Sequence, residues 1–278
     1  MFHRKTLFLL CLFTIALLAI FAACTTNHPT TETAKPVFHI PVVVQEPTKD
    51  TVEFIKAYTL RHVYFNYLGK YKFTDTLKLA ENPERDTIFL NDEIIGYSHI
   101  RAGDTLNTDG FQIFVDYKTS IHKNQYKHMG YHESNYYFPI YIVNETSRAK
   151  LFIAKDRYMF GIQEAMDTTD SRGFKPIEYR GHDFCGNGYF GMIVRPGEFI
   201  LGLIPKYEGN EKQSMKIRLR IGPQIYFSPE YSGTFNREQF ILKRDKWGYL
   251  SLEDCNTNTI KSQFYGAIPK GYKERGVN

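Results

Sequence analysis

The sequence predicts a mainly β protein, in which an antiparallel immunoglobulin-like β-sandwich over residues 136–242 follows a smaller β-rich region over residues 37–122. Three observations support this fold class. The chain contains 22 phenylalanines and 20 tyrosines, which favour strands. Its apolar residues recur mostly at every second position, and glycine, proline and asparagine separate the runs. The antibody pattern of two cysteines around a tryptophan is absent, so the prediction concerns the sandwich architecture alone.

The strand prediction is clearest over Met215–Ile221, where apolar and basic residues alternate. Side chains of a strand alternate between its two faces, so we expect Ile217 and Leu219 to face the core and Arg218 to face water. Arg218 and the basic residues two positions away on each side then form either a solvated strand face or a contact for lipid phosphates or an acidic glycan.

A proline–glycine turn predicts a β-hairpin in the same region. Arg195-Pro196-Gly197 lies between two β-prone runs, Tyr189–Val194 and Glu198–Ile204, and the proline and glycine favour a type II turn. Further strands are predicted at Tyr136–Val143, Arg157–Ile162, Phe174–Tyr179 and Ile225–Phe227.

The region before the sandwich is β-rich but less regular. A short helix is predicted over Glu53–Arg61, and the region forms either a separate first domain or strands that complete the sandwich. Residues 118–135 indicate a polar connection, and residues 243–278 indicate a C-terminal tail. The candidate strands of the region are Phe38–Val44, Val63–Leu68, Thr87–Leu90 and Phe111–Tyr117.

Residues 1–23 have the pattern of an export signal that is removed. Arg4 and Lys5 precede an apolar run, Leu7–Phe21, and small residues end the segment. As a helix this run spans only about 22 Å. A hydrocarbon core is about 30 Å thick, so we do not expect a permanent transmembrane span. The final residues, Phe21-Ala22-Ala23-Cys24, resemble the lipobox of bacterial lipoproteins.

This resemblance implies cleavage before Cys24 and acyl chains, such as palmitate, on that residue. Two or three chains anchor a protein stably to a membrane, whereas one does not. Residues 24–36 then form a flexible tether, because they contain many threonines and almost no apolar side chain to bury. The resemblance also implies sorting by the next residue, and Thr25 favours the outer membrane. We therefore expect a lipid-anchored outer-membrane protein that faces the periplasm.

Charge and motifs argue against several classes of partner. The net charge is only +5 at pH 7, and removal of the signal lowers it, so no nucleic-acid partner is expected. Gly186–Gly191 matches the spacing of a dinucleotide-binding loop, but that loop requires a following helix. A β-prone run and Pro196-Gly197 follow here. We therefore expect no cofactor.

The best candidates for catalytic chemistry are His122, His128, His132 and Glu133. Imidazole and carboxylate are ligands that zinc prefers. Their spacing matches no closed zinc motif, and His132-Glu133 lacks the second histidine of a protease helix, so no metal is predicted. We therefore expect a non-enzymatic binding or structural module for an envelope protein or glycan. The alternative is an envelope hydrolase or metal-dependent enzyme that uses residues 122–133.

Two modifications of the mature chain are candidates. Cys185 and Cys255 remain after processing, in a compartment that permits disulfides, and they form either a bridge or two thiols. Asp-Thr pairs followed by an aliphatic residue or threonine occur five times. These triplets resemble the acceptor motif of general periplasmic O-glycosylation in one group of Gram-negative bacteria; alternatively, aspartate ends a turn and threonine begins a strand. The threonines are Thr51, Thr76, Thr87, Thr105 and Thr168.

Overall fold

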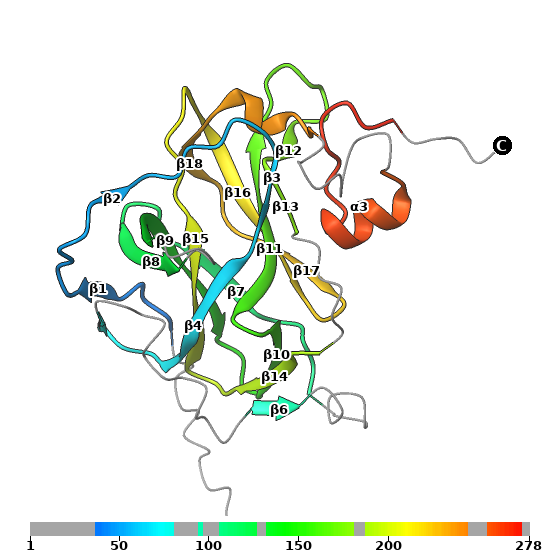
Figure 1. Cartoon of the computed structure of the whole chain (residues 1–278). Helices are drawn as coiled ribbons and strands as arrows, with labels where there is room; N and C mark the ends of the chain where they lie inside the picture. Colours follow the sequence, from blue (N-terminus) through cyan, green and yellow to red (C-terminus); the bar gives the residue numbers. More distant parts are fainter. Residues whose placement is uncertain are drawn as a thin grey trace, which may run out of the picture. The chain divides into compact units, whose positions relative to one another are not determined.

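Figure 1 shows the computed structural model of the chain, which describes residues 37–80, 94–96, 106–126, 132–180, 187–243 and 255–273. Residues 36–278 form one compact unit. Its described residues are mostly strands with two short helices, which confirms the predicted mainly β, sandwich-like fold. No helix among these described residues is long and apolar enough to cross a membrane.

The described elements follow one another along the chain in this order. The first part contains β1 (Val42–Gln45), β2 (Val52–Glu53), β3 (Arg61–Val63), β4 (Phe65–Lys72), β5 (Thr76–Leu79), β6 (Ile94–Gly96), β7 (Gln112–Val115), β8 (Ile121–Tyr126) and β9 (His132–Asn144). The second part contains β10 (Lys150–Lys155), β11 (Tyr158–Met166), β12 (Phe174–Pro176), β13 (Glu178–Arg180), β14 (Tyr189–Val194), β15 (Glu198–Pro205), β16 (Glu211–Ile221), β17 (Gln224–Phe227), β18 (Tyr231–Phe235), the 3₁₀ helix η3 (Arg237–Phe240) and α3 (Thr257–Gln263).

A central layer of three antiparallel strands, β9, β15 and β4, is buried on both faces. In β9, Phe138 and Ile140 pack into the main core, whereas Tyr137 and Tyr141 pack into a second core on the opposite face. All four side chains are at most 1% exposed. A strand covered on both sides needs apolar residues at consecutive positions, which explains the unbroken apolar run in this part of the sequence.

Other strands cover the two faces of this layer. The parallel pair β1 and β5 covers the second core, together with Phe38. The strands β10, β14 and β16 cover the main core. Strand β11 links the layers, because it pairs with β4 at Met159 and with β16 from Phe160 onward; Figure 1 shows it between these strands. Parallel pairs also join β2 to β9 and β3 to β13, so the predicted antiparallel arrangement is corrected to a mixed one.

The predicted turn at Pro196 is confirmed, but the predicted hairpin is wrong. Glu198 N–H donates to the Arg195 carbonyl at 3.1 Å, and Gly197 has the positive φ of 77° that a type II turn requires. The two flanking strands do not pair with each other. Instead β14 pairs with β10 and β6, and β15 pairs with β4 and β9. The turn therefore carries the chain from one layer to the other.

The region before residue 122 supplies strands that complete the sandwich. Strand β4 lies between β15 and β11 in the sheet, and β7 pairs with β9. The helix predicted over Glu53–Arg61 is wrong. Ile55 instead forms an isolated bridge with Tyr207, in which its N–H donates to the Lys206 carbonyl at 3.2 Å and its carbonyl accepts from Glu208 N–H at 3.0 Å. Pairing with a neighbouring strand thus overrides the local helical pattern. Thr87–Leu90 lies outside the described residues.

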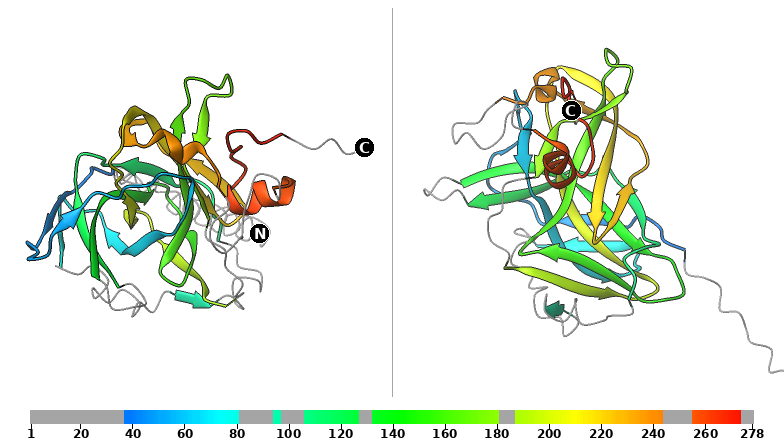
Figure 2. Two further views of the ribbon diagram at one scale, coloured as in Figure 1. Left: turned by 45° about the horizontal axis from the view of Figure 1, so that its top comes forward. Right: turned by 90° about the vertical axis from the view of Figure 1, so that its right-hand side faces the viewer.

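Two segments that the sequence presented as irregular are structured. Within the predicted connection over residues 118–135, β8 pairs antiparallel with the start of β9, and Ile121 is buried in the second core. In the predicted C-terminal tail, α3 begins at Thr257, and Ile260 and Phe264 pack into the main core. Figure 2 shows α3 lying against the strands. A few apolar side chains in a polar segment were enough to dock each of these elements.

The register predicted for β16 is confirmed, but the environment predicted for Arg218 is wrong. Ile217 and Leu219 are 0% and 1% exposed. The Arg218 side chain is only 15% exposed and forms an ion pair with Glu164 at 3.2 Å. Its guanidinium also lies 4.6 Å from the Phe227 ring centroid. Neighbouring β11 brings a carboxylate to the outer face of β16, which the sequence of β16 alone does not reveal.

Candidate binding site

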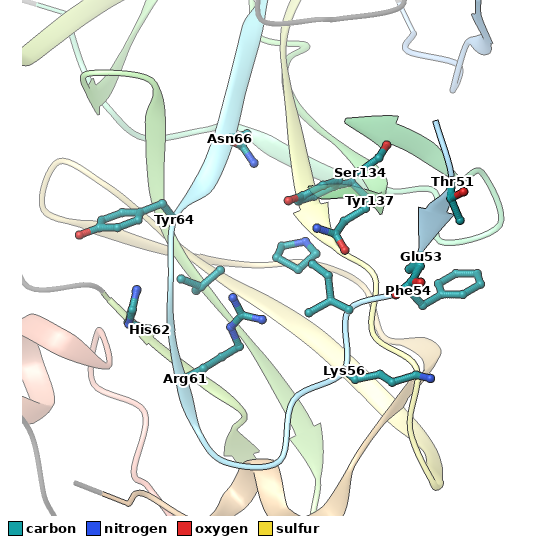
Figure 3. A pocket seen from close by; sticks show the side chains of 14 residues that line it. Thr51, Glu53, Phe54, Lys56, Arg61, His62, Tyr64, Asn66, Ser134 and Tyr137 are labelled. Atoms are coloured by element: carbon teal, nitrogen blue, oxygen red, sulfur yellow. The ribbon is translucent and has the colours of Figure 1, made fainter. Parts of the chain in front are cut away.

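A pocket of about 610 Å³ opens where the chain crosses from one sheet edge to another. It is lined by residues 51–56, by β3 and the start of β4, by residues 134–137 of β9 and by Pro205. Figure 3 shows these side chains around the cavity. Segments far apart in the sequence therefore form its walls.

Strand pairing explains why these segments meet. β2 extends the sheet beside Ser134 and Asn135 of β9, in a parallel pairing. The chain then bridges at Ile55 and reaches β3, which pairs with β13. Residues 52–63 thus span the gap between two sheet edges. The pocket lies beneath this crossing segment.

Arg61 is the principal charged group of the pocket. Its side chain is half-buried, and Figure 3 shows the guanidinium pointing into the cavity. It forms no hydrogen bond or ion pair with the part of the chain that the structure describes. Glu178 is its partner in the register of β3 with β13. The guanidinium therefore presents its donors to the cavity.

Two amide side chains add hydrogen-bonding groups. Lys123 Nζ donates to Asn66 Oδ1 at 2.6 Å. This contact fixes the orientation of the amide, and Figure 3 shows the amide nitrogen of Asn66 directed into the pocket. Neither this nitrogen nor the Asn135 side chain has a hydrogen-bond partner among the described residues. The pocket therefore offers donors from three side chains to a ligand.

Aromatic rings border the pocket on two sides. Phe54 is 39% exposed and rests against Tyr136, with ring centroids 4.7 Å apart. Tyr64 is 37% exposed and rests against Tyr158 at 4.6 Å. Figure 3 shows Phe54 and Tyr64 on opposite sides of the cavity, with both rings extending outward to its rim. Each ring is held by packing on one side and leaves apolar surface accessible on the other.

A buried polar network supports the wall behind Arg61. The Glu178 side chain is fully buried, and its Oε1 accepts from the Tyr207 hydroxyl at 2.5 Å and from Gln163 Nε2 at 2.9 Å. Its Oε2 accepts from Gln163 N–H at 2.7 Å. Gln163 Nε2 also donates to the carbonyl of Pro205, a pocket residue, at 3.0 Å. The network thus connects β11, β13 and β15 beneath the cavity.

The ionisation of Glu178 is set by opposing effects. Burial raises the pKa of its carboxyl, because the charged form loses water. The donors on Tyr207 and Gln163 and the charge of Arg61 lower that pKa, but burial outweighs them. Burial likewise raises the pKa of the Tyr207 hydroxyl. Burial therefore shifts the equilibrium of both groups towards their neutral forms.

Of the histidine-rich candidates, His122 is described with its side chain and is not among the residues that line the pocket. His122 N–H, on β8, donates to Gln45 Oε1 at 3.0 Å. His132 and Glu133 begin β9, immediately before the pocket residues of that strand. His128 lies outside the described residues. Among the described residues, no group of three or more histidines, cysteines or acidic residues could hold a metal ion, and the metal-free state stays a prediction.

The structure describes only some of the residues that are candidates for modification. Cys24 and Cys185 lie outside the described residues, whereas Cys255 is 4% exposed in the main core. Thr51, Thr76 and Thr168 are exposed, and Thr51 lies at the pocket. The other two candidate threonines, Thr87 and Thr105, lie outside the described residues. Lipidation, the disulfide and O-glycosylation stay predictions.

Apart from Thr51, a candidate for O-glycosylation, the residues of the pocket were not candidates from the sequence, because none of them belongs to a known motif. Glu178 offered one signal, since an acidic residue inside the β-prone run Phe174–Tyr179 is unusual in a strand. Arg61 offered none. The arrangement can hold a ligand with many hydrogen-bond acceptors and some apolar surface. No family model, curated protein or solved structure matches this chain.

Proposed function

We propose that this protein is a lipid-anchored protein of the cell envelope that binds a glycan in its pocket without altering it chemically. The observation that supports this proposal is the pocket, in which the donors of Arg61, Asn66 Nδ2 and Asn135 have no partner among the described residues and whose borders carry exposed rings. Its volume lies within the range of about 300–1,000 Å³ that is usual for small-ligand sites.

Glycans suit this combination of groups. Their hydroxyl and ring oxygens accept hydrogen bonds, which Arg61, Asn66 and Asn135 can donate. The C–H faces of sugar rings are apolar and pack on aromatic rings such as those of Phe54 and Tyr64. Preformed walls lower the entropy lost on binding, and the strands and the buried network beneath the pocket supply such walls. The pocket thus matches a binding module better than a catalytic centre.

The anchor part of the proposal depends on the N-terminal sequence. Acyl chains on Cys24 hold the protein at the membrane, where two or three chains are needed for stable attachment. The tether from residue 24 to residue 36, if extended, spans about 40 Å. The pocket can therefore reach envelope polymers at some distance from the membrane surface. In this arrangement the protein is attached to the outer membrane, and its pocket is exposed to the periplasm.

The anchor is tested by acylation in a Gram-negative host. The wild type should incorporate labelled fatty acid and partition into detergent, and Cys24→Ala should abolish both. Cys11→Ala is the matched control, because Cys11 leaves with the signal and its loss should change neither result. Labelling of Cys24→Ala at the wild-type level would contradict the anchor.

The pocket is tested by replacing its exposed ring. The full-length protein is screened on an array of bacterial glycan fragments, and the tightest binder is titrated by saturation-transfer nuclear magnetic resonance. Phe54→Ala should weaken this binding by about 2- to 10-fold, the usual contribution of one aromatic contact. Phe227→Ala is the control, because Phe227 is similarly exposed, at 48%, and does not line the pocket. Binding unaffected by Phe54→Ala, or no binding to any fragment, would contradict the proposal.

A further inference from the structure

We infer that the pocket selects an acidic sugar, whose anionic group binds the Arg61 guanidinium while its hydroxyls contact the amides of Asn66 and Asn135. This inference rests on the proposed binding function. The inference adds the chemical class of the ligand. It also names the residue that discriminates an acidic sugar from a neutral one.

The first argument is that the donors of Arg61 are uncommitted. A guanidinium presents a planar set of N–H groups that matches the two oxygens of a carboxylate or a phosphate. Arg61 has no hydrogen bond or ion pair within the described chain, although it is half-buried. The two lysines at or near the pocket are engaged. Lys56 pairs with Glu208 at 3.4 Å, and Lys123 binds Asn66.

The second argument concerns the carboxylates near Arg61. Glu178 is fully buried behind the wall, and both of its oxygens already accept hydrogen bonds from Tyr207 and Gln163. Its oxygens therefore do not occupy the Arg61 donors that face the cavity. Glu53 is the acidic residue that lines the pocket, and Figure 3 shows it beside Phe54, on the far side from the Arg61 guanidinium. The middle of the cavity is thus open to an anion.

The third argument is that an anion alone would leave the pocket largely empty. The cavity of about 610 Å³ extends from Arg61 to the rings and amides on its other walls. Asn66 Nδ2 and the Asn135 amide require acceptors, and hydroxyl groups supply them. A sugar ring that carries one anionic substituent satisfies the guanidinium and the amides together. The anionic oxygens can belong to a carboxylate or to a phosphate.

Three probes that share one sugar ring test this inference, and they differ only in the substituent at carbon 6. Glucuronate carries a carboxylate, glucose 6-phosphate carries a phosphate, and glucose is neutral. Each is titrated into the full-length protein by saturation-transfer nuclear magnetic resonance. We expect at least one acidic probe to bind about 10-fold or more tightly than glucose, as for a hydrogen bond to a charged group. The acidic probe that binds more tightly shows whether the anionic oxygens belong to a carboxylate or to a phosphate.

Variants of Arg61 test whether this residue causes the preference for an acidic probe over glucose. Arg61→Gln should reduce the binding of the preferred acidic probe to the level of glucose, with glucose binding changed less than about twofold. Arg61→Lys keeps the charge but loses the planar pair of donors, so it should retain part of the preference. Arg237→Gln is the matched control, because Arg237 is exposed on η3 and does not line the pocket. It should behave as the wild type.

The outcomes separate this inference from the proposed function. Equal binding of acidic and neutral probes to the wild type would overturn the acidic-sugar inference and leave glycan binding intact. A preference that persists in Arg61→Gln would also overturn it, because another residue would then select the anion. If no probe binds and no glycan fragment on the array binds, both the inference and the proposed function are wrong. The comparison of probes on the wild type needs no variant, so it holds even if Arg61→Gln unfolds.

Discussion

Glu178→Ala should lower the free energy of unfolding by about 2–6 kcal/mol, because it leaves two buried donors without an acceptor and each such group costs about 1–3 kcal/mol. The change leaves the Tyr207 hydroxyl and the Gln163 N–H without their acceptor in a site that water does not reach. It also empties the wall behind the pocket. Chemical denaturation at neutral pH measures this loss.

Glu178→Gln is the matched control, since it keeps the shape and one acceptor oxygen. It should cost less than Glu178→Ala, and it should change the dependence of stability on pH. The pKa of Glu178 is raised in the folded state, so the folded protein binds more protons than the unfolded chain between the two pKa values. The stability of the wild type should therefore fall as the pH rises through this window, and Glu178→Gln should lack that component. Equal stability of all three proteins at every pH would contradict the buried network.

Leu219→Ala should destabilise the protein by about 2–5 kcal/mol, the usual cost of removing a buried leucine side chain. Leu219 is 1% exposed in the main core. It packs closely against β11, where a methyl group on Gly161 would lie only 2.6 Å from Leu219 Cδ2. The space around Leu219 is therefore already filled by neighbouring atoms. Rigid strands on both sides restrict collapse into the cavity that the substitution leaves.

Arg218→Ala tests the opposite face of the same strand. It removes the closer of two cations from Glu164, whose side chain is 2% exposed, and leaves Lys216 at 3.8 Å. We expect a loss of about 1–3 kcal/mol. Arg220→Ala is the control, because Arg220 is exposed and should change stability by less than about 0.5 kcal/mol. A loss for Arg218→Ala no larger than for Arg220→Ala would show that the ion pair contributes nothing. Equal losses for Leu219→Ala and Arg220→Ala would contradict the register.

The local features of the fold were predictable from the sequence, because they depend on neighbouring residues. The alternation in Met215–Ile221 determines which side chains of β16 are buried, and Pro196-Gly197 determines a turn. The pairing partner of a strand depends on distant segments. The turn at Pro196 is compatible with a hairpin or with a change of layer, and only the burial of β15 between β4 and β9 selects the second.

The site was not predictable for a related reason. Its walls combine residues from the segments 51–56, 61–66 and 134–137 with Pro205, and no short motif spans these positions. The histidine-rich segment has chemically versatile residue types, but His122 does not line the pocket and His128 lies outside the described residues. Glu178 shows how a single polar residue in a β-prone run can indicate a buried network. Sequence alone does not reveal that Tyr207 and Gln163 complete that network.

The most direct test of pocket binding is to map where a sugar contacts the protein. Glucuronate is added to isotope-labelled full-length protein, and the side-chain amide signals of Asn66 and Asn135 are followed by nuclear magnetic resonance. Both signals should shift with one common dissociation constant, whereas the amide signal of Asn210, which does not line the pocket, should stay in place. Shifts confined to residues outside the pocket, with Asn66 and Asn135 unmoved at saturation, would contradict the assignment of this pocket as the binding site.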